Sequence, residues 1–178
     1  MDNVDRDEAA DIVRREVQRI FGETLGLQPS NTSTSSGLEN DMPEALVCEP
    51  DAAVARALDG ALRSLGYQID VQTGLQESFQ ALDQAYDLVV VGHAFAEDPE
   101  GGKTLLRKLA GGSPERRRHT FVAFVSPKYK SLDGLPAFVL GADIVISSAD
   151  VGRAMELLRE GIRGKAQLYR VFERCQRG

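Results

Sequence analysis

Residues 87–92 read DLVVVG, four consecutive apolar residues between an aspartate and a glycine. A short run that is apolar on both faces is typical of a central strand in a parallel sheet, because helices cover such a strand from both sides. Apolar segments that predict further strands lie on either side of it, at residues 45–50, 67–73, 119–126 and 142–148. Stretches with apolar residues at helical spacing predict helices over 52–66, 75–85, 101–111, 131–141 and 150–176.

This alternation of strands and helices predicts an α/β fold, because parallel neighbours have to be joined by crossovers. We expect a flavodoxin-like five-stranded parallel sheet in the order 2-1-3-4-5, with helices on both faces and an extended last helix. Sites in such sheets lie at the carboxyl ends of the strands. The loops at that edge, after strands one, three and four, hold residues 49–51, 92–102 and 126–130.

The composition narrows the class of protein. The 178 residues are 42% hydrophobic and 27% charged, which is typical of a soluble globular protein. No apolar run approaches the roughly 20 residues of a membrane-spanning helix, and the acidic residues 1–11 contain no secretory signal. We therefore expect a cytoplasmic protein without membrane insertion. Two cysteines and two histidines are too few for a zinc ribbon or a disulfide framework. No metal or cofactor is expected.

The net charge of −6 belongs to the first part of the chain. Residues 1–44 hold 10 acidic and 4 basic side chains, and residues 45–178 hold 17 of each. A neutral main domain lacks the electrostatic footprint of a nucleic-acid-binding protein.

Four segments follow from these patterns. Residues 1–27 predict an N-terminal amphipathic helix, with Ile12, Val13, Val17, Ile20 and Phe21 at helical spacing within 6–22. Residues 28–43 are rich in Ser, Thr, Asn and Pro and predict a flexible linker. The main domain is expected over 44–163, and residues 164–178 extend its last helix.

Three blocks of the main domain resemble the receiver domains of bacterial two-component response regulators. The block ALVCEPDAAVARALDGALRSLGY (45–67) resembles the receiver opening, in which a strand ends in an acidic pair. The block YDLVVVGHAF (86–95) resembles the central strand, which in receivers ends in the phospho-accepting aspartate. The block LGADIVISSAD (140–150) resembles a receiver segment that continues to a lysine and a proline.

The resemblance implies a pocket that has lost most of the family's chemical groups. The family positions fall as follows: the acidic pair on Glu49 and Pro50 with Asp51 adjacent, the acceptor on Gly92, the hydroxyl on Val125 or Ser126, and the lysine on Ser148. Without the acceptor carboxylate there is neither a phosphoester nor a third oxygen ligand for Mg²⁺. The resemblance therefore implies a degenerate receiver, or pseudo-receiver, that is not an enzyme and acts through protein contacts in signal transduction.

Other interpretations stay open at this stage. A displaced acceptor, Asp98 or His93, would keep the chain a phosphorylatable regulator. Alternatively, the space that Gly92 opens would admit a small molecule. Asp51 can instead cap the following helix. Neither histidine is expected next to a nucleophile, and residues 115–119, ERRRH, are interpreted as a solvated turn.

Receivers contact partners through the fourth helix, fifth strand and fifth helix, and the resemblance carries this face over. The implied contact residues are Leu135, Phe138, Val139, Val145 and Met155. The last helix continues this apolar seam through Tyr169 and Phe172. Past the edge of the sheet, the seam should pair with the same helix of a second copy, giving a homodimer, or fold against the N-terminal helix.

Overall fold

The computed structural model describes residues 42–176, with side chains up to residue 170. The predicted N-terminal helix and all but the last two residues of the predicted linker lie outside the described residues. The elements in chain order are β1 (Glu44–Cys48), α2 (Ala52–Ser64), β2 (Gln68–Gln72), α3 (Leu75–Ala81), β3 (Leu88–Gly92), α4 (Gly101–Ala110), α5 (Pro114–His119), β4 (Phe121–Ser126), α6 (Gly134–Leu140), β5 (Ile144–Ser147), the 3₁₀-helix η1 (Ser148–Arg153) and α7 (Ala154–Gln176). Within this part of the chain, every helix is too short or too polar to span a membrane.

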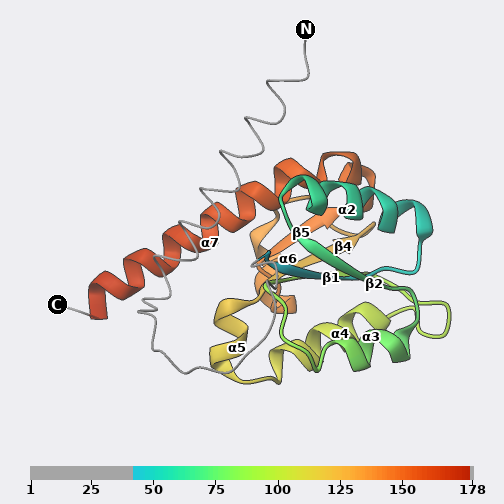
Figure 1. Ribbon diagram of the computed structural model, residues 1–178, viewed down its shortest axis with the longest axis horizontal. Helices are drawn as coiled ribbons and strands as arrows, with labels where there is room; N and C mark the ends of the chain where they lie inside the picture. The colour runs from blue at the N-terminus through green and yellow to red at the C-terminus, as the bar shows by residue number, and fades with distance from the viewer. Residues whose placement is uncertain (1–41, 177–178) are drawn as a thin grey trace, which may run out of the picture.

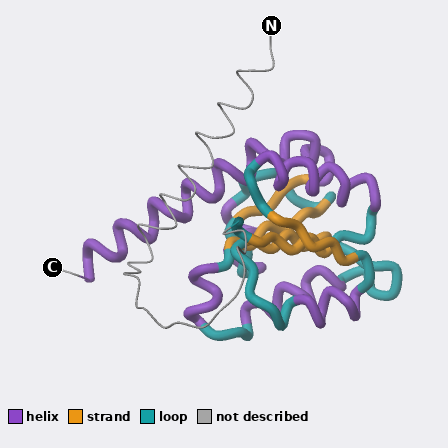
Figure 2. Tube along the Cα trace, in the orientation of Figure 1, coloured by secondary structure: helices purple, strands orange, loops and turns teal. Residues whose placement is uncertain are grey.

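The five strands form one parallel sheet in the order β2-β1-β3-β4-β5, which confirms the predicted α/β architecture. The strands make the middle layer of the molecule, between two layers of helix (Figure 2). Helices α2 and α7 cover one face, and α3 and α4 cover the other (Figure 1). Helix α6 packs on the second face through Ala137.

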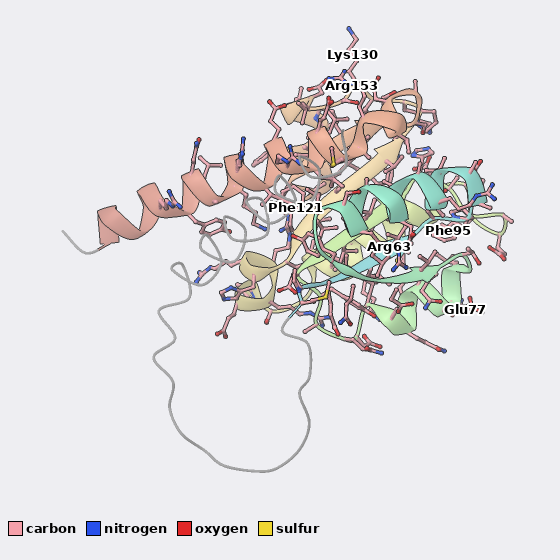
Figure 3. All side chains as sticks on the ribbon, turned by 45° about the horizontal axis from the view of Figure 1, so that its top comes forward. Arg63, Glu77, Phe95, Phe121, Lys130 and Arg153 are labelled. Carbon is pink, nitrogen blue, oxygen red and sulfur yellow. The ribbon has the colours of Figure 1, made fainter. Side chains whose placement is uncertain are left out.

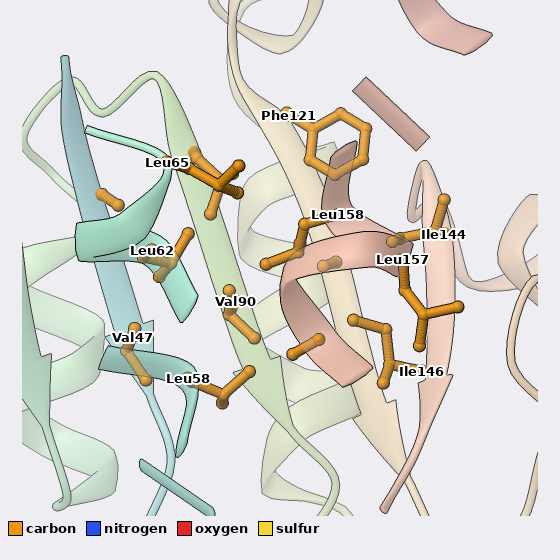
Figure 4. Close-up of a cluster of buried hydrophobic side chains, with 14 of the residues drawn as sticks. Val47, Leu58, Leu62, Leu65, Val90, Phe121, Ile144, Ile146, Leu157 and Leu158 are labelled. Carbon is orange, nitrogen blue, oxygen red and sulfur yellow. The ribbon is translucent and has the colours of Figure 1, made fainter. Parts of the chain in front are cut away.

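The central strand supplies both cores. Leu88 and Val90 of β3 belong to the cluster under α2 and α7, which Figure 4 shows in close-up. Val89 and Val91 belong to the cluster under α3, α4 and α6. Because alternate side chains of a strand point to opposite faces, a strand buried on both faces has to be apolar throughout. The burial of all four residues explains the DLVVVG run.

Helix α5 corrects the prediction of a solvated turn at residues 115–119. Two of its arginines hold other elements in place. The Arg116 guanidinium donates to the carbonyl oxygen of Leu82 at 2.8 Å, and that of Arg117 donates to Gly141 O at 2.7 Å and to the Asp143 carboxylate at 3.1 Å. The basic run therefore ties β5 and the end of α3 together at the amino edge of the sheet.

The same carboxylate anchors the last helix. Lys165 of α7 donates to Asp143 Oδ2 at 3.0 Å and to Thr120 O at 2.7 Å. Its ammonium lies 5.9 Å from the ring centroids of Phe121 and Tyr169, and Phe121 lies beneath α7 (Figure 3). Burial lowers the pKa of Lys165, against the opposing effect of Asp143. Beyond this anchor, α7 extends past the sheet as predicted (Figure 1).

Candidate functional site

Glu49 and Gly92 meet at the carboxyl edge of the sheet. Glu49 directly follows β1, Gly92 ends β3, and the two strands are neighbours. The Glu49 side chain is only 6% exposed, and its Oε1 accepts a hydrogen bond from the Asp51 N–H at 3.0 Å. A Cβ built on Gly92 would lie 2.8 Å from Cδ of Glu49. The Glu49 carboxyl group therefore occupies the space in which any side chain at position 92 would begin. Burial raises the pKa of Glu49.

Asp51, the other acidic residue of this loop, serves the helix that follows. Its Oδ1 accepts hydrogen bonds from the N–H groups of Ala53 at 2.8 Å and Val54 at 3.0 Å. These are the orphan donors of the first turn of α2. The bonds from Val54 and Ala53 lower the pKa of Asp51. The carboxylate is thus an N-cap that faces solvent.

His93 and Ser126 form a hydrogen-bonded pair between the ends of β3 and β4. The Ser126 Oγ lies 3.2 Å from the His93 Nδ1, and the Lys128 N–H donates to the same Oγ at 3.1 Å. The His93 ring also packs against Phe124, with 5.8 Å between ring centroids. Burial, followed by the positive charge of Lys128, lowers the pKa of His93, which favours a neutral imidazole. This pairing corrects the prediction that neither histidine lies next to a nucleophile.

The serine of this pair is closed to substrate. Ser126 is fully buried, and a buried hydroxyl that already bonds a backbone N–H and an imidazole has no open face for attack on an acyl or phosphoryl group. Val125 belongs to the cluster under α2 and α7, and the Ser126 hydroxyl lies at the strand end beside His93.

An ion-pair cluster borders the histidine. The Glu100 carboxylate accepts from the ammonium groups of Lys103 and Lys128, the latter at 3.1 Å. The bonds from Lys103 and Lys128 lower the pKa of Glu100 to about 2. Lys128 joins the loop after β4 to the start of α4, an arrangement that sequence analysis did not identify. The sequence did place Lys128 in one of the three loops predicted to form the site, and this was the feature that could have identified it.

Asp98, the first proposed substitute acceptor, belongs to a tight turn. Its backbone exchanges hydrogen bonds with Phe95 at 2.9 and 3.0 Å. Its Oδ1 accepts from the Glu100 N–H at 2.8 Å. The carboxylate therefore stabilises the entry to α4.

The remaining predicted position, Ser148, begins η1, one residue past the pairing of Ser147 with Ser126.

Among the described residues, no three His, Cys, Asp or Glu side chains are grouped closely enough to hold a metal ion. The carboxyl edge thus brings together Glu49, Gly92, His93 and Ser126, whose polar groups bond to one another or to nearby backbone.

The predicted contact face divides into exposed and buried residues. Leu135, Phe138 and Val139 of α6 are 73%, 84% and 72% exposed. Val145 is fully buried, which corrects its assignment to the surface. Its side chain lies on the face of the sheet that α3, α4 and α6 cover, and it packs in the cluster beneath them. Met155 is half-buried against the opposite cluster.

The seam of the last helix turns partly inward. Tyr169 is half-buried beside Lys165, and the side chain of Phe172 lies outside the described residues. Leu168, which the predicted seam omits, is 73% exposed. It lines an open groove of about 850 Å³ between α7 and the start of β5.

Comparison with known proteins gives a match in fold only. No protein-family model matches the sequence, and no curated protein matches it. A putative response regulator from Chloroflexus aurantiacus aligns over 71% of this chain and 99% of its own, at 17% identity and a TM-score of 0.56. A response regulator from Thermotoga maritima aligns over 68% and 98%, at 23% identity and a TM-score of 0.53. A chemotaxis response regulator of Vibrio cholerae aligns over 70% and 98%, at 11% identity and 0.54. The chain therefore has the fold of response-regulator receiver domains.

Proposed function

We propose that this chain is a pseudo-receiver, a non-catalytic signalling or scaffold module that acts through protein contacts. The observation that carries the proposal is the close approach of Glu49 to Gly92. In receivers the acceptor carboxylate stands at the end of the central strand, where this chain has glycine. A Cβ built at Gly92 would lie 2.8 Å from Cδ of Glu49, so the Glu49 carboxyl group takes up space that an acceptor side chain would need.

The test is incubation with acetyl phosphate and Mg²⁺, followed by intact-mass measurement, with a phosphorylatable receiver as a positive control. We expect no mass change. A gain of one phosphoryl group that is lost in Asp98→Ala or His93→Ala would overturn the proposal. Of these two, His93 is the stronger alternative, because its lowered pKa favours the neutral, nucleophilic ring.

The contact surface that we propose is α6 with the adjoining part of α7. Leu135, Phe138 and Val139 occur at i, i+3 and i+4 and so share one side of α6. Contiguous exposed apolar side chains mark protein-contact sites more often than single ones do. A second copy of the chain, paired through the last helix, is the first partner to test.

Sedimentation equilibrium over a range of protein concentrations tests this partner. Self-association that is weakened by Leu168→Ser, on the last helix, and unchanged by Val71→Ser would support it. Val71 is the matched control because it is also an exposed apolar residue, on β2 at the opposite edge of the sheet. A monomer at every concentration would exclude the homodimer.

A further inference from the structure

We infer that the N-terminal segment, residues 1–22, docks in the groove beside α7 of its own chain. The groove has a volume of about 850 Å³ and lies between the start of β5 and the middle of α7. Gly161, Gly164 and Leu168 line it from α7, and Leu132 and Ile144 line it from the other side. A Cβ built on Gly164 has no atom within 4 Å, so the described residues leave this part of the groove open, with room for an added methyl group as well as for an incoming helix.

The apolar pattern of the segment matches this groove. Residues 6–22 carry Ile12, Val13, Val17, Ile20 and Phe21 at helical spacing. An amphipathic helix of this kind gains most of its stability by burying its apolar face against a partner. The groove presents Leu168, which is 73% exposed, and Leu132, which is 37% exposed.

The tether is long enough to allow docking within one chain. The described part begins beside β1 at the amino edge of the sheet, the edge at which β5 also starts. Strands β1 and β5 are three steps apart, which corresponds to about 14 Å at about 4.8 Å per step. The segment 23–41 is about 19 residues long, and a flexible chain of that length spans about 24 Å on average.

Charge and tether agree on the orientation. Residues 1–11 hold five acidic side chains and one basic, whereas residues 162–178 hold five basic and one acidic. The linker keeps residue 22 on the side of the amino edge, so residue 1 would lie at the outer end of α7. The docked helix would then be antiparallel to α7. This orientation brings the acidic start of the chain beside the basic end of α7. The lengths also match, because a helix over residues 6–22 would be about 26 Å long and residues 161–176 of α7 span about 24 Å.

The tether also favours the segment over a second copy. A short flexible linker gives an effective concentration of about 1 mM, well above that of free protein in a dilute solution. The docking is argued from the groove and from the sequence of residues 1–22.

A docked segment would compete with a protein partner for the surface along α7. This consequence rests on the proposed function.

Hydrogen exchange on the full chain, with no partner present, tests the docking. We expect the backbone amides of residues 161–170 to exchange about tenfold faster in Val17→Ser/Ile20→Ser, given an intrinsic dissociation constant of about 0.1 mM against an effective concentration of about 1 mM. The control, Gln18→Ser, introduces a serine on the opposite side of the predicted helix from Val17 and Ile20 and should exchange like the wild type. Neither variant changes a charge or a residue of the main domain.

Two results would overturn the inference. Equal exchange in the wild type and in Val17→Ser/Ile20→Ser would show that residues 1–22 do not cover the groove. Protection that grows with protein concentration, between about 1 and about 100 µM, would show that a second copy covers it. Neither result bears on phosphorylation, so this test and that of the proposed function fail independently.

Discussion

Two glycines of α7 lead to opposite predictions for the same substitution. A Cβ built at Gly161 lies 2.6 Å from Cγ2 of Ile144 and 2.8 Å from Cζ of Phe121, two buried side chains of the sheet. A Cβ built at Gly164, one turn later, has no atom within 4 Å. Alanine therefore meets the core at the first position and open space at the second.

The expected free energies follow from this difference. In a helix interior, alanine is about 1 kcal/mol more favourable than glycine. Gly164→Ala should therefore raise the free energy of unfolding by about 0.5–1 kcal/mol. At Gly161 the same gain is opposed by overpacking, which costs about 1–3 kcal/mol. Gly161→Ala should then be the less stable variant by about 2 kcal/mol, or about 6 °C in Tm for a domain of this size.

Urea and thermal unfolding of the two variants and the wild type give the measurement. Gly60→Ala in α2 is the control, because a Cβ there also has no atom within 4 Å and should stabilise as Gly164→Ala does. Equal stability of Gly161→Ala and Gly164→Ala would mean that α7 does not approach β4 and β5 this closely. The anchoring of α7 described above would then be wrong.

Three further predictions concern the carboxyl edge and α6. Burial raises the pKa of Glu49, so its contribution to stability is present below its ordinary pKa and is lost as pH rises through the folded-state value. Glu49→Gln should therefore gain stability relative to wild type as pH rises above the ordinary range of a carboxyl group; a pH-independent difference in unfolding free energy would contradict this. Lys128→Met should raise the pKa of His93 in an NMR titration, because a neighbouring positive charge is removed and Glu100 loses a cation, whereas Lys130→Met should leave it unchanged. Phe138→Ser should change the free energy of unfolding by less than about 0.5 kcal/mol, since the side chain is 84% exposed; a larger loss in urea unfolding would show that Phe138 packs on its own domain.

The sheet was predictable because the periodicity of apolar residues encodes which sides of an element are buried. Residues 87–92 are apolar on both faces and form the central strand, and crossover rules then limit the strand order. Helix α5 was missed because its six residues, PERRRH, contain no apolar periodicity. It is held by hydrogen bonds from Arg116 and Arg117 to residues distant in sequence, which no local pattern reveals.

The site was predictable only as far as topology places strand ends together. The contact between His93 and Ser126 joins residues 33 positions apart, and it depends on the register that pairs Gly92 with Val125. A shift of one residue would turn the hydroxyl toward the other face of the sheet. The burial of Val145 has the same origin, because strand residues alternate between faces and its neighbours Ile144 and Ile146 belong to the opposite cluster.

Among the described residues, the edge that receivers use for chemistry and the surface that they use for contacts differ in how their side chains are bonded. At the carboxyl edge, the Glu49 carboxyl group accepts a backbone hydrogen bond, Asp51 caps a helix, and Glu100 binds two lysines. Each of these bonds ties an acidic side chain of this edge to the surrounding structure. By contrast, every exposed large apolar side chain of the described residues except Val71 lies on α6, in the loop before it, or on α7. Burial of apolar surface against another surface is favourable, and this distribution therefore supports the contact surface that we propose along α6 and α7.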